Sequence, residues 1–334
     1  MESPAGCAIL FGVDAIVLKA FGGPENLVFE DVPEPVPGEG QVLVELAATG
    51  VNFIDIYHRT GRYPGPVPRI LGSEGAGRVV AVGPGVDGIG VGDRVVSAYL
   101  EGAYAQRAVA PAEKVVPVPE SVSDETAAAV MLQGLTAHYL LFDTYPVRPG
   151  DTILVHAAAG GVGLLLTQIA TRLGARVIAT VSTEEKERLA RGAGAAEVIR
   201  YGDGVDVAAE VRRLTDGHGV AAVYDGVGAA TFDASLASLR PRGVLALFGA
   251  ASGPVPPVDP QRLNAAGSVY LTRPTLGHYT ATPEELRRRT DDLFRFIADG
   301  LDVRIYDRYP LAEAARAQMD LESRRTTGKL LLIP

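Results

Sequence analysis

The chain of 334 residues is 47% hydrophobic and 21% charged, a balance typical of a globular protein large enough for two domains and unlike that of a disordered one. Its net charge of -9 argues against nucleic acid as a partner, because affinity for a phosphate backbone depends on a surplus of Lys and Arg. No apolar run reaches the roughly 18 residues of a spanning helix, and Glu2 stands where an export signal carries cations, so we expect a cytoplasmic protein with no membrane partner.

The first third of the chain predicts a β-rich partial barrel. Residues 1–12 are expected to form an irregular extension, and the first strand-like run is Asp14 to Lys19. Val32 to Gly38 is expected to be a turn between strands, because its closely spaced prolines remove N–H donors from any ladder. Gly- and Pro-rich turns separate three further apolar strands: Gln41 to Ala47, Gly77 to Val82 and Arg94 to Ser97.

From about Asp151 strands and helices alternate strictly, which predicts a doubly wound parallel sheet. The expected strands are Thr152 to His156, Arg176 to Val181, Glu197 to Tyr201, Ala221 to Asp225 and Val244 to Gly249. The expected helices between them are Val162 to Leu173, Glu184 to Gly192, Val207 to Thr215 and Ala230 to Leu239.

Near Tyr270 the alternation stops, and the rest of the chain predicts a return to the first domain. Pro283 to Gly300 is an amphipathic helix, and its Arg287 to Arg289 is expected to be a solvated face rather than an RNA-binding patch. Lys329 to Ile333 is strand-like and is expected to rejoin the first domain. The predicted fold is therefore α/β, with a cofactor domain, residues 135–273, inserted into a β-rich domain, residues 13–134 and 274–334.

The turn from Ala158 to Gly163 lies between an apolar strand and an apolar helix, the context that a dinucleotide-binding turn requires. Gly160 and Gly161 would let the backbone approach a pyrophosphate, and Gly163 would allow close packing of helix on strand. The helix N-terminus, which begins near Val162, supplies N–H groups and a partial positive charge. Ala158 replaces the first glycine of the usual pattern, so a plain packing turn is the alternative.

The end of the second strand indicates NADPH rather than NADH. An NAD enzyme usually offers an acidic residue there to the ribose hydroxyls, whereas this chain has Ser182 and Thr183, followed by Lys186. Hydroxyls and an ammonium can bind a 2′-phosphate, which a carboxylate would repel. Glu184 and Glu185 are better explained as residues that compensate the dipole of the helix they begin.

Together with the glycine-rich turn, several segments make the chain similar to the medium-chain dehydrogenase/reductase superfamily, and within it to the quinone oxidoreductases related to zeta-crystallin. These segments are Gly50 to Tyr57, Leu71 to Gly77, Gln133 to Ala137, Asp225 to Gly228 and Leu271 to Pro274. The resemblance implies a GroES-like partial barrel that carries an inserted Rossmann domain, with a nicotinamide cofactor in the cleft between them. It also implies a homodimer through an edge strand of the cofactor domain, for which Gly267 to Leu271 is the candidate.

The resemblance also bears on metal binding. Zinc alcohol dehydrogenases of this superfamily carry a cysteine ligand in the segment matching Gly50 to Tyr57 and a histidine ligand in the segment matching Gly72 to Gly75. Neither segment supplies that ligand here, where Ser73 stands beside Glu74, and a single Cys7 cannot build a four-cysteine site. We therefore expect no metal, and an acceptor that takes hydride readily, such as a quinone or an activated enone.

The same resemblance makes Asn52 and Tyr57 candidate catalytic residues that flank the nicotinamide and the substrate, with Asp55 orienting them. From the residues alone, Asn52 could instead satisfy a turn and Tyr57 could pack in the core. Thr136, expected at the start of the helix that leads into the cofactor domain, is the candidate contact to the nicotinamide ribose. Its alternative role is a locally capped or packed helix residue.

Further candidate cofactor contacts follow from the resemblance. Lys186, Tyr201 and Arg324 are the candidates for holding the 2′-phosphate and adenosine, although each could be a solvated surface residue and Arg325 rivals Arg324. The remaining candidates, beside the path of the nicotinamide or at its edge, are Phe248, Gly249 and Arg273. The histidines show no metal spacing and are assigned no role: His58, His138, His156, His218 and His278.

Three functions remain open at this point. The first is an NADPH-dependent quinone reductase, and the second is an NADPH-dependent enone or enoyl-thioester reductase with the same fold and cofactor. The third is a structural or regulatory protein that binds NADPH without depending on catalysis.

Overall fold

The computed structural model describes residues 12–202 and 204–334, and within them the chain forms two compact units. Unit 1 contains the residues up to Met131, Asp307–Arg324 and Leu330–Pro334, and unit 2 contains Leu132–Tyr306 and Arg325–Lys329. The predicted extension lies outside the described residues except for Gly12, which begins a strand. The predicted division into domains at residues 134 and 273 stays a prediction. None of the helices in the described ranges is long and apolar enough to cross a bilayer.

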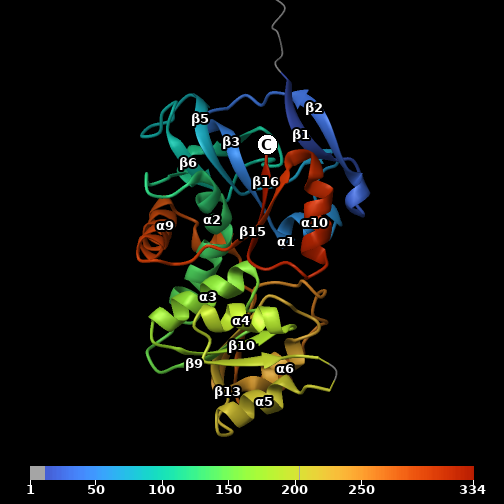
Figure 1. Cartoon of the computed structure of the whole chain (residues 1–334), viewed down its shortest axis with the longest axis vertical. Helices are drawn as coiled ribbons and strands as arrows, with labels where there is room; N and C mark the ends of the chain where they lie inside the picture. The colour runs from blue at the N-terminus through green and yellow to red at the C-terminus, as the bar shows by residue number, and fades with distance from the viewer. Residues whose placement is uncertain (1–11, 203) are drawn as a thin grey trace, which may run out of the picture. The chain divides into compact units, whose positions relative to one another are not determined.

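Two antiparallel sheets form most of unit 1. A three-stranded sheet has the order β2 (Leu27–Pro33), β1 (Gly12–Leu18) and β4 (Arg69–Ile70). A seven-stranded sheet has the order β15 (Ile305–Pro310), β16 (Lys329–Ile333), β3 (Gln41–Val51), β5 (Gly75–Val82), β6 (Arg94–Ser97) and β8 (Val116–Pro117), with β7 (Arg107–Pro111) also paired to β3. Figure 1 shows β3, β5 and β6 together in this unit.

The predicted turn from Val32 to Gly38 is partly wrong. Val32 and Pro33 are the last residues of β2, where they pair with Val13 and Gly12 of β1. Proline is tolerated at this position because the strand ends there and its missing N–H breaks no further ladder bond. The turn proper starts at Glu34.

The C-terminal strand does rejoin the β-rich unit, as predicted. β16 pairs antiparallel with β3, with Leu330 opposite Val51 and Leu332 opposite Thr49. Leu330 and Leu332 are fully buried in one apolar cluster with Ile16 of the first strand. The first described strand and the last strand are therefore held in one core, which explains why the unit is built from separate segments.

Unit 2 contains the predicted doubly wound parallel sheet, in the order β11 (Glu197–Arg200), β10 (Arg176–Val181), β9 (Thr152–Val155), β12 (Val220–Asp225), β13 (Leu239–Leu247) and β14 (Tyr270–Thr272). The α/β fold class is thus confirmed. The sheet has six strands rather than five, because Tyr270–Thr272 pairs in parallel with β13. This short strand overlaps the predicted edge segment, Gly267 to Leu271, but starts three residues later and ends one residue later.

Four helices connect β9 to β13 along the chain: α3 (Gly161–Arg172), α4 (Glu184–Gly192), α5 (Val207–Leu214) and α6 (Phe232–Ser238). The strand order runs outward from β9 in one direction and then reverses at β12, so right-handed crossovers put α3 and α4 on one face and α5 and α6 on the other. The contacts α3 with α4 and α5 with α6 agree with this (Figure 1). A ligand is expected at such a reversal, beyond the carboxyl ends of the strands.

The remaining helices are α1 (Phe53–Arg59), α2 (Asp124–Tyr139), α7 (Pro260–Ala265), α8 (Leu276–Tyr279), α9 (Pro283–Ala298) and α10 (Ala314–Glu322). Thr136 lies near the end of α2, so its predicted place at the start of that helix is wrong. The solvated face predicted for α9 is also wrong at Arg289, which is buried and donates to Asp143 Oδ2 at 2.5 Å and to the Tyr279 carbonyl at 2.6 Å. A buried guanidinium requires such partners. The spacing of residues along α9 could not reveal them, because Asp143 and Tyr279 lie outside this helix.

Candidate functional site

The glycine-rich turn of unit 2 ends in a helix N-terminus that is open to a ligand. Helix α3 starts at Gly161 with Gly160 as its N-cap, and within the described ranges no side chain caps it. Helix α4, by contrast, is capped by the Thr183 hydroxyl and carries Glu184 and Glu185 in its first turn. The positive end of the α3 dipole is therefore left for an anion from outside the chain.

A side chain at each glycine of this turn would meet different surroundings, so the glycines are needed for different physical reasons. A Cβ at Gly163 would lie 2.5 Å from the Ala157 carbonyl oxygen, so this glycine is required by packing of the helix on the turn. A Cβ at Gly161 would collide with the flexible side chain of Gln133. At Gly160 φ is an ordinary -77°, and a Cβ would meet, in the part of the chain that the structure describes, only the Ala157 oxygen at 3.2 Å. The space above Gly160 is thus kept open, as a phosphate cradle requires.

The predicted 2′-phosphate residues lie at neighbouring strand ends. Ser182 and Thr183 follow β10 and are exposed, and the Thr183 hydroxyl accepts a hydrogen bond from the Lys186 backbone N–H at 3.2 Å. Tyr201 follows β11, and its N–H donates to the Val181 carbonyl at 2.9 Å. Lys186 is half-buried, and this burial lowers the pKa of its ammonium. The structure therefore brings these four residues into one region of unit 2.

The candidates for the nicotinamide end also meet within unit 2. The N–H groups of Phe248 and Gly249 donate to the Asp225 carbonyl at 2.9 and 3.3 Å. Arg273, directly after β14, donates from Nη1 to the Phe248 carbonyl at 2.9 Å. A Cβ at Gly249 would lie 2.4 Å from the Gly226 carbonyl oxygen, so glycine is required for this close approach. The carboxyl ends of β12, β13 and β14 are thus tied together.

In unit 1 the candidate catalytic residues follow β3. Asn52 precedes α1, and its backbone N–H donates to Asp55 Oδ2 at 2.9 Å. The Asn52 side-chain Nδ2 donates to Glu74 Oε2 at 2.8 Å and to the Gly50 carbonyl at 3.3 Å. Tyr57 is buried, with the Arg62 guanidinium 4.7 Å from its ring centre. Asn52 is therefore fixed by three hydrogen bonds, and Asp55 orients its backbone.

Sequence reasoning missed the polar residues that hold this group in place. The Tyr104 hydroxyl donates to Asp55 Oδ2 at 2.9 Å, and Gln318 Nε2 lies 3.4 Å from the same hydroxyl. Burial raises the pKa of Tyr104 well above its usual value, and the Asp55 carboxylate adds to this. The Arg59 guanidinium donates to Gln318 Oε1 at 3.0 Å and to Glu322 Oε2 at 2.8 Å. These residues come from distant parts of the chain, so no spacing pattern could have linked them.

The replacement Tyr104→Phe is expected to destabilise the protein by about 1–2 kcal/mol, because it removes a hydroxyl from a buried carboxylate. Tyr309→Phe is the matched control, since it removes a hydroxyl that donates to the less buried Asp320 at 2.9 Å. Urea unfolding of both variants checks the difference. An equal or smaller loss at Tyr104 would contradict the structural role assigned to its hydroxyl.

Two of the predicted cofactor contacts, Arg324 and Thr136, do not lie with the residues predicted to act beside them in the same unit. Arg324 belongs to unit 1 and has a left-handed φ of 56°, whereas Lys186 and Tyr201 belong to unit 2. Thr136 belongs to unit 2, and its hydroxyl donates to the Leu132 carbonyl at 2.7 Å, a local helix contact. Residues 12–202 and 204–334 contain no cluster of three His, Cys, Asp or Glu side chains suited to a metal ion.

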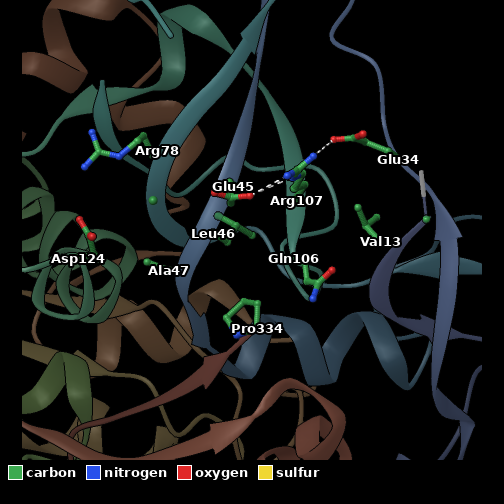
Figure 2. Close-up of a pocket in the computed structure, with 12 residues that line it drawn as sticks. Val13, Glu34, Glu45, Leu46, Ala47, Arg78, Gln106, Arg107, Asp124 and Pro334 are labelled. Carbon is green, nitrogen blue, oxygen red and sulfur yellow. Dashed lines mark hydrogen bonds and ion pairs between the residues drawn. The ribbon is translucent and has the colours of Figure 1, made fainter. Parts of the chain in front are cut away.

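A hollow of about 790 Å³ lies in unit 1, and neither Asn52 nor Tyr57 is among the residues that line it (Figure 2). Its most prominent feature is Arg107, which lies between Glu34 and Glu45 and donates to Glu45 at 2.8 Å. These hydrogen bonds raise the pKa of Arg107. The positive charge of Arg107 is therefore neutralised by two carboxylates of the same chain. We assign this hollow no part in binding a cofactor or an acceptor.

Comparison with known proteins agrees with this geometry. Residues 161–292 match the family model described as zinc-binding dehydrogenase, and residues 38–120 match the alcohol dehydrogenase GroES-like domain. The chain is 51% identical to a quinone oxidoreductase of Pseudomonas aeruginosa, covering 96% of this chain and 99% of that one. It is 43% identical to a 2-haloacrylate reductase of a Burkholderia species, with the same coverage of both chains. A mycobacterial protein solved in complex with NADPH superposes with a TM-score of 0.94 at 58% identity, covering 96% of this chain and all of that one.

Proposed function

Because this chain belongs to the quinone oxidoreductases of the medium-chain dehydrogenase/reductase superfamily, we propose that it is an enzyme that reduces quinones with NADPH. The observation that carries this proposal is the open N-terminus of α3 above Gly160, followed one strand later by Ser182, Thr183 and Lys186. Such a pair of anion sites suits a dinucleotide that bears an additional phosphate.

Each part of the cofactor has residues suited to hold it. Gly160, Gly161 and Val162 offer backbone N–H groups to the pyrophosphate. The 2′-phosphate and adenosine are assigned to the group at the ends of β10 and β11: Ser182, Thr183, Lys186 and Tyr201. Arg324 and Thr136 retain their proposed contacts to the phosphate and to the nicotinamide ribose.

At the reacting end, Phe248, Gly249 and Arg273 are proposed to border the nicotinamide. NADPH, when bound, supplies the hydride, and a quinone that takes up this hydride and one proton becomes a hydroquinone. Asn52 and Tyr57 are proposed to orient the acceptor, and Asp55 holds Asn52 in place through its backbone N–H. The contribution of these residues is orientation and hydrogen bonding, because the reducing power comes from the cofactor.

The proposal predicts that 1,4-benzoquinone will cause rapid loss of the 340 nm absorbance of NADPH, on the order of 1–1,000 turnovers per second. Asn52→Ala is expected to lower this rate by about 10- to 1,000-fold, because it removes an orienting hydrogen-bonding group. A stopped-flow assay under nitrogen with several quinones measures it. Tight NADPH binding without turnover on any acceptor would favour a structural or regulatory protein instead.

A second candidate acceptor is an activated carbon–carbon double bond. The similarity to a 2-haloacrylate reductase favours it, since such a substrate needs the same hydride and proton but offers a carbon as the acceptor. Turnover of an α,β-unsaturated ketone or thioester without turnover of quinones would select this reading over quinone reduction.

We further propose a homodimer through strand β14. This strand is an edge of the six-stranded sheet, and its Tyr270 is 62% exposed. An exposed edge with an aromatic side chain is a surface that a second copy can extend. Sedimentation equilibrium should give a dimer that Tyr270→Lys weakens; a monomeric wild type would contradict the proposal. The cytoplasmic location remains a prediction from the sequence.

A further inference from the structure

A buried polar cluster surrounds His156, a residue that the proposed function does not use. His156 follows β9 directly, Thr180 lies in β10, Asp225 ends β12 and Ser235 lies on α6. These four side chains are almost completely shielded from solvent. Burying so many polar groups is costly unless each has a partner, so their arrangement requires an explanation.

The Asp225 carboxylate receives four donors. Its Oδ1 accepts the N–H groups of Val227 and Gly228 at 2.8 and 3.0 Å. The Thr231 hydroxyl lies 2.7 Å from Oδ2, and the Ser235 hydroxyl lies 2.7 Å from the same oxygen. A carboxylate can only accept, so both hydroxyls donate hydrogen bonds to it.

This arrangement determines the protonation of His156. Because the Ser235 hydroxyl uses its single proton in the hydrogen bond to Asp225, it must accept a hydrogen bond from His156 Nε2, 3.0 Å away. Burial lowers the pKa of His156, an effect that the Asp225 carboxylate partly offsets, and the neutral ring leaves Nδ1 as an acceptor. The Thr180 hydroxyl, 2.9 Å from Nδ1, supplies the matching donor. His156 is therefore a neutral imidazole with its proton on Nε2.

Every partner of His156 leads to a different segment of the proposed cofactor site. His156 itself precedes the glycine-rich turn, and its backbone N–H donates to Tyr224 of β12 at 3.1 Å. Thr180 lies in the strand that leads to Ser182, and its carbonyl accepts from Ala158 in the turn at 3.1 Å. Through Ser235 and Asp225, the network reaches the loop from Gly226 to Gly228, against which Gly249 is packed.

We propose that His156 is a positioning residue that holds the glycine-rich turn, the end of β10 and the Asp225–Gly228 loop in one geometry around the bound cofactor. This inference rests on the proposed function. Beyond the last ladder hydrogen bonds, neighbouring strands of a twisted sheet diverge and their loops lose mutual support. A side chain that donates on one side and accepts on the other replaces that support, as residues behind a binding site commonly do.

The test compares His156→Phe with His156→Gln. Phe fills the same space without either ring nitrogen, whereas the Gln amide can still donate to Ser235 from near the position of Nε2. We expect His156→Phe to raise the Kd for NADPH by about 10- to 100-fold, with kcat at saturating NADPH changed by less than about 3-fold. His156→Gln should recover most of that affinity. Fluorescence titration gives Kd, and steady-state assays give the KM-against-kcat split.

A residue that only fills the core gives a different result. In that case His156→Phe, which keeps a planar apolar ring, would bind NADPH as the wild type does, and this outcome overturns the positioning role. Ser235→Ala is the second variant, needed if His156→Phe does not fold. It should weaken NADPH in the same way, because it removes the link between His156 and Asp225, and wild-type affinity in Ser235→Ala would overturn the role equally.

The tautomer is tested without reference to activity. Nitrogen-15 NMR of ¹⁵N-histidine-labelled protein, assigned by comparison with His156→Phe, should show a neutral ring protonated at Nε2 at pH 7. A ring protonated at Nδ1, or at both nitrogens, overturns the inferred network. Failure of the wild type to bind NADPH would overturn the proposed function and the positioning role with it. Normal wild-type binding with unchanged binding in both Phe and Ala variants overturns the positioning role alone.

Discussion

Lys186→Ala is expected to weaken NADPH binding by about 10- to 100-fold and to leave NADH binding within about 2-fold, since a charge-assisted contact to phosphate contributes about 1.5–3 kcal/mol. The lysine lies on the first turn of α4, where its backbone N–H donates to the Thr183 hydroxyl. NADH lacks the 2′-phosphate, so the loss of the ammonium should not affect it. Paired fluorescence titrations with both nucleotides measure the change in preference.

The matched control is Arg188→Ala, which removes the same charge from an exposed position two residues later on the same helix. It should change neither affinity by more than about 2-fold, because exposed charges contribute little. The burial that lowers the pKa of Lys186 adds a second signature: NADPH affinity should fall as the pH rises through that pKa, because the ammonium loses its proton. An unchanged preference in Lys186→Ala would show that another group selects the phosphate.

The second large effect is expected from the glycine-rich turn. Gly160→Ala should reduce NADPH affinity by about 10-fold or more and alter the free energy of unfolding by less than about 1 kcal/mol. The reason is geometric: within the described chain a Cβ at Gly160 would meet only the Ala157 oxygen, at 3.2 Å, a contact that a shift of a few tenths of an ångström relieves. A methyl group there therefore obstructs the ligand more than the fold.

Gly163→Ala is the control, because the same methyl group enters the fold instead. Its Cβ would lie 2.5 Å from the Ala157 oxygen and 2.7 Å from the Ala158 Cα, which are backbone atoms that cannot move aside separately. We expect a loss of about 1–3 kcal/mol, measured by urea unfolding of the cofactor-free protein. If Gly160→Ala destabilised the protein as much as Gly163→Ala and still bound NADPH normally, the turn would be a packing feature and not a cradle.

Each of the two units contains a buried carboxylate that accepts hydrogen bonds from a backbone N–H and from a side-chain hydroxyl. In unit 1, Asp55 accepts from the Asn52 backbone and from Tyr104, and in unit 2, Asp225 accepts from its own loop and from Ser235. Each carboxylate stands directly behind residues assigned to the cofactor or the acceptor. Rigid positioning of this kind suits a reaction in which the cofactor supplies the chemistry and the protein supplies the geometry.

The sequence by itself determined the features that depend on local pattern. The alternation after Asp151 is set by burial of both faces of a parallel sheet, so the strands from Thr152 to Asp225 and α4 lie within one residue of their predicted bounds. Hydroxyls in place of an acid after Val181, and the glycines before α3, indicated a phosphorylated dinucleotide because both signals lie within a few residues.

Only the tertiary structure decided what depends on residues far apart in the chain. Tyr104 reaches Asp55 across 49 positions and Gln318 reaches Tyr104 across 214, and no periodicity encodes such pairs. The edge strand expected at Gly267 to Leu271 forms as Tyr270–Thr272, because these are the residues that pair with β13. His156 looked like one scattered histidine, yet its tautomer follows from three neighbours on separate elements. A hydrogen-bond network is a property of atoms brought together by packing, and it becomes visible only when the fold has joined them.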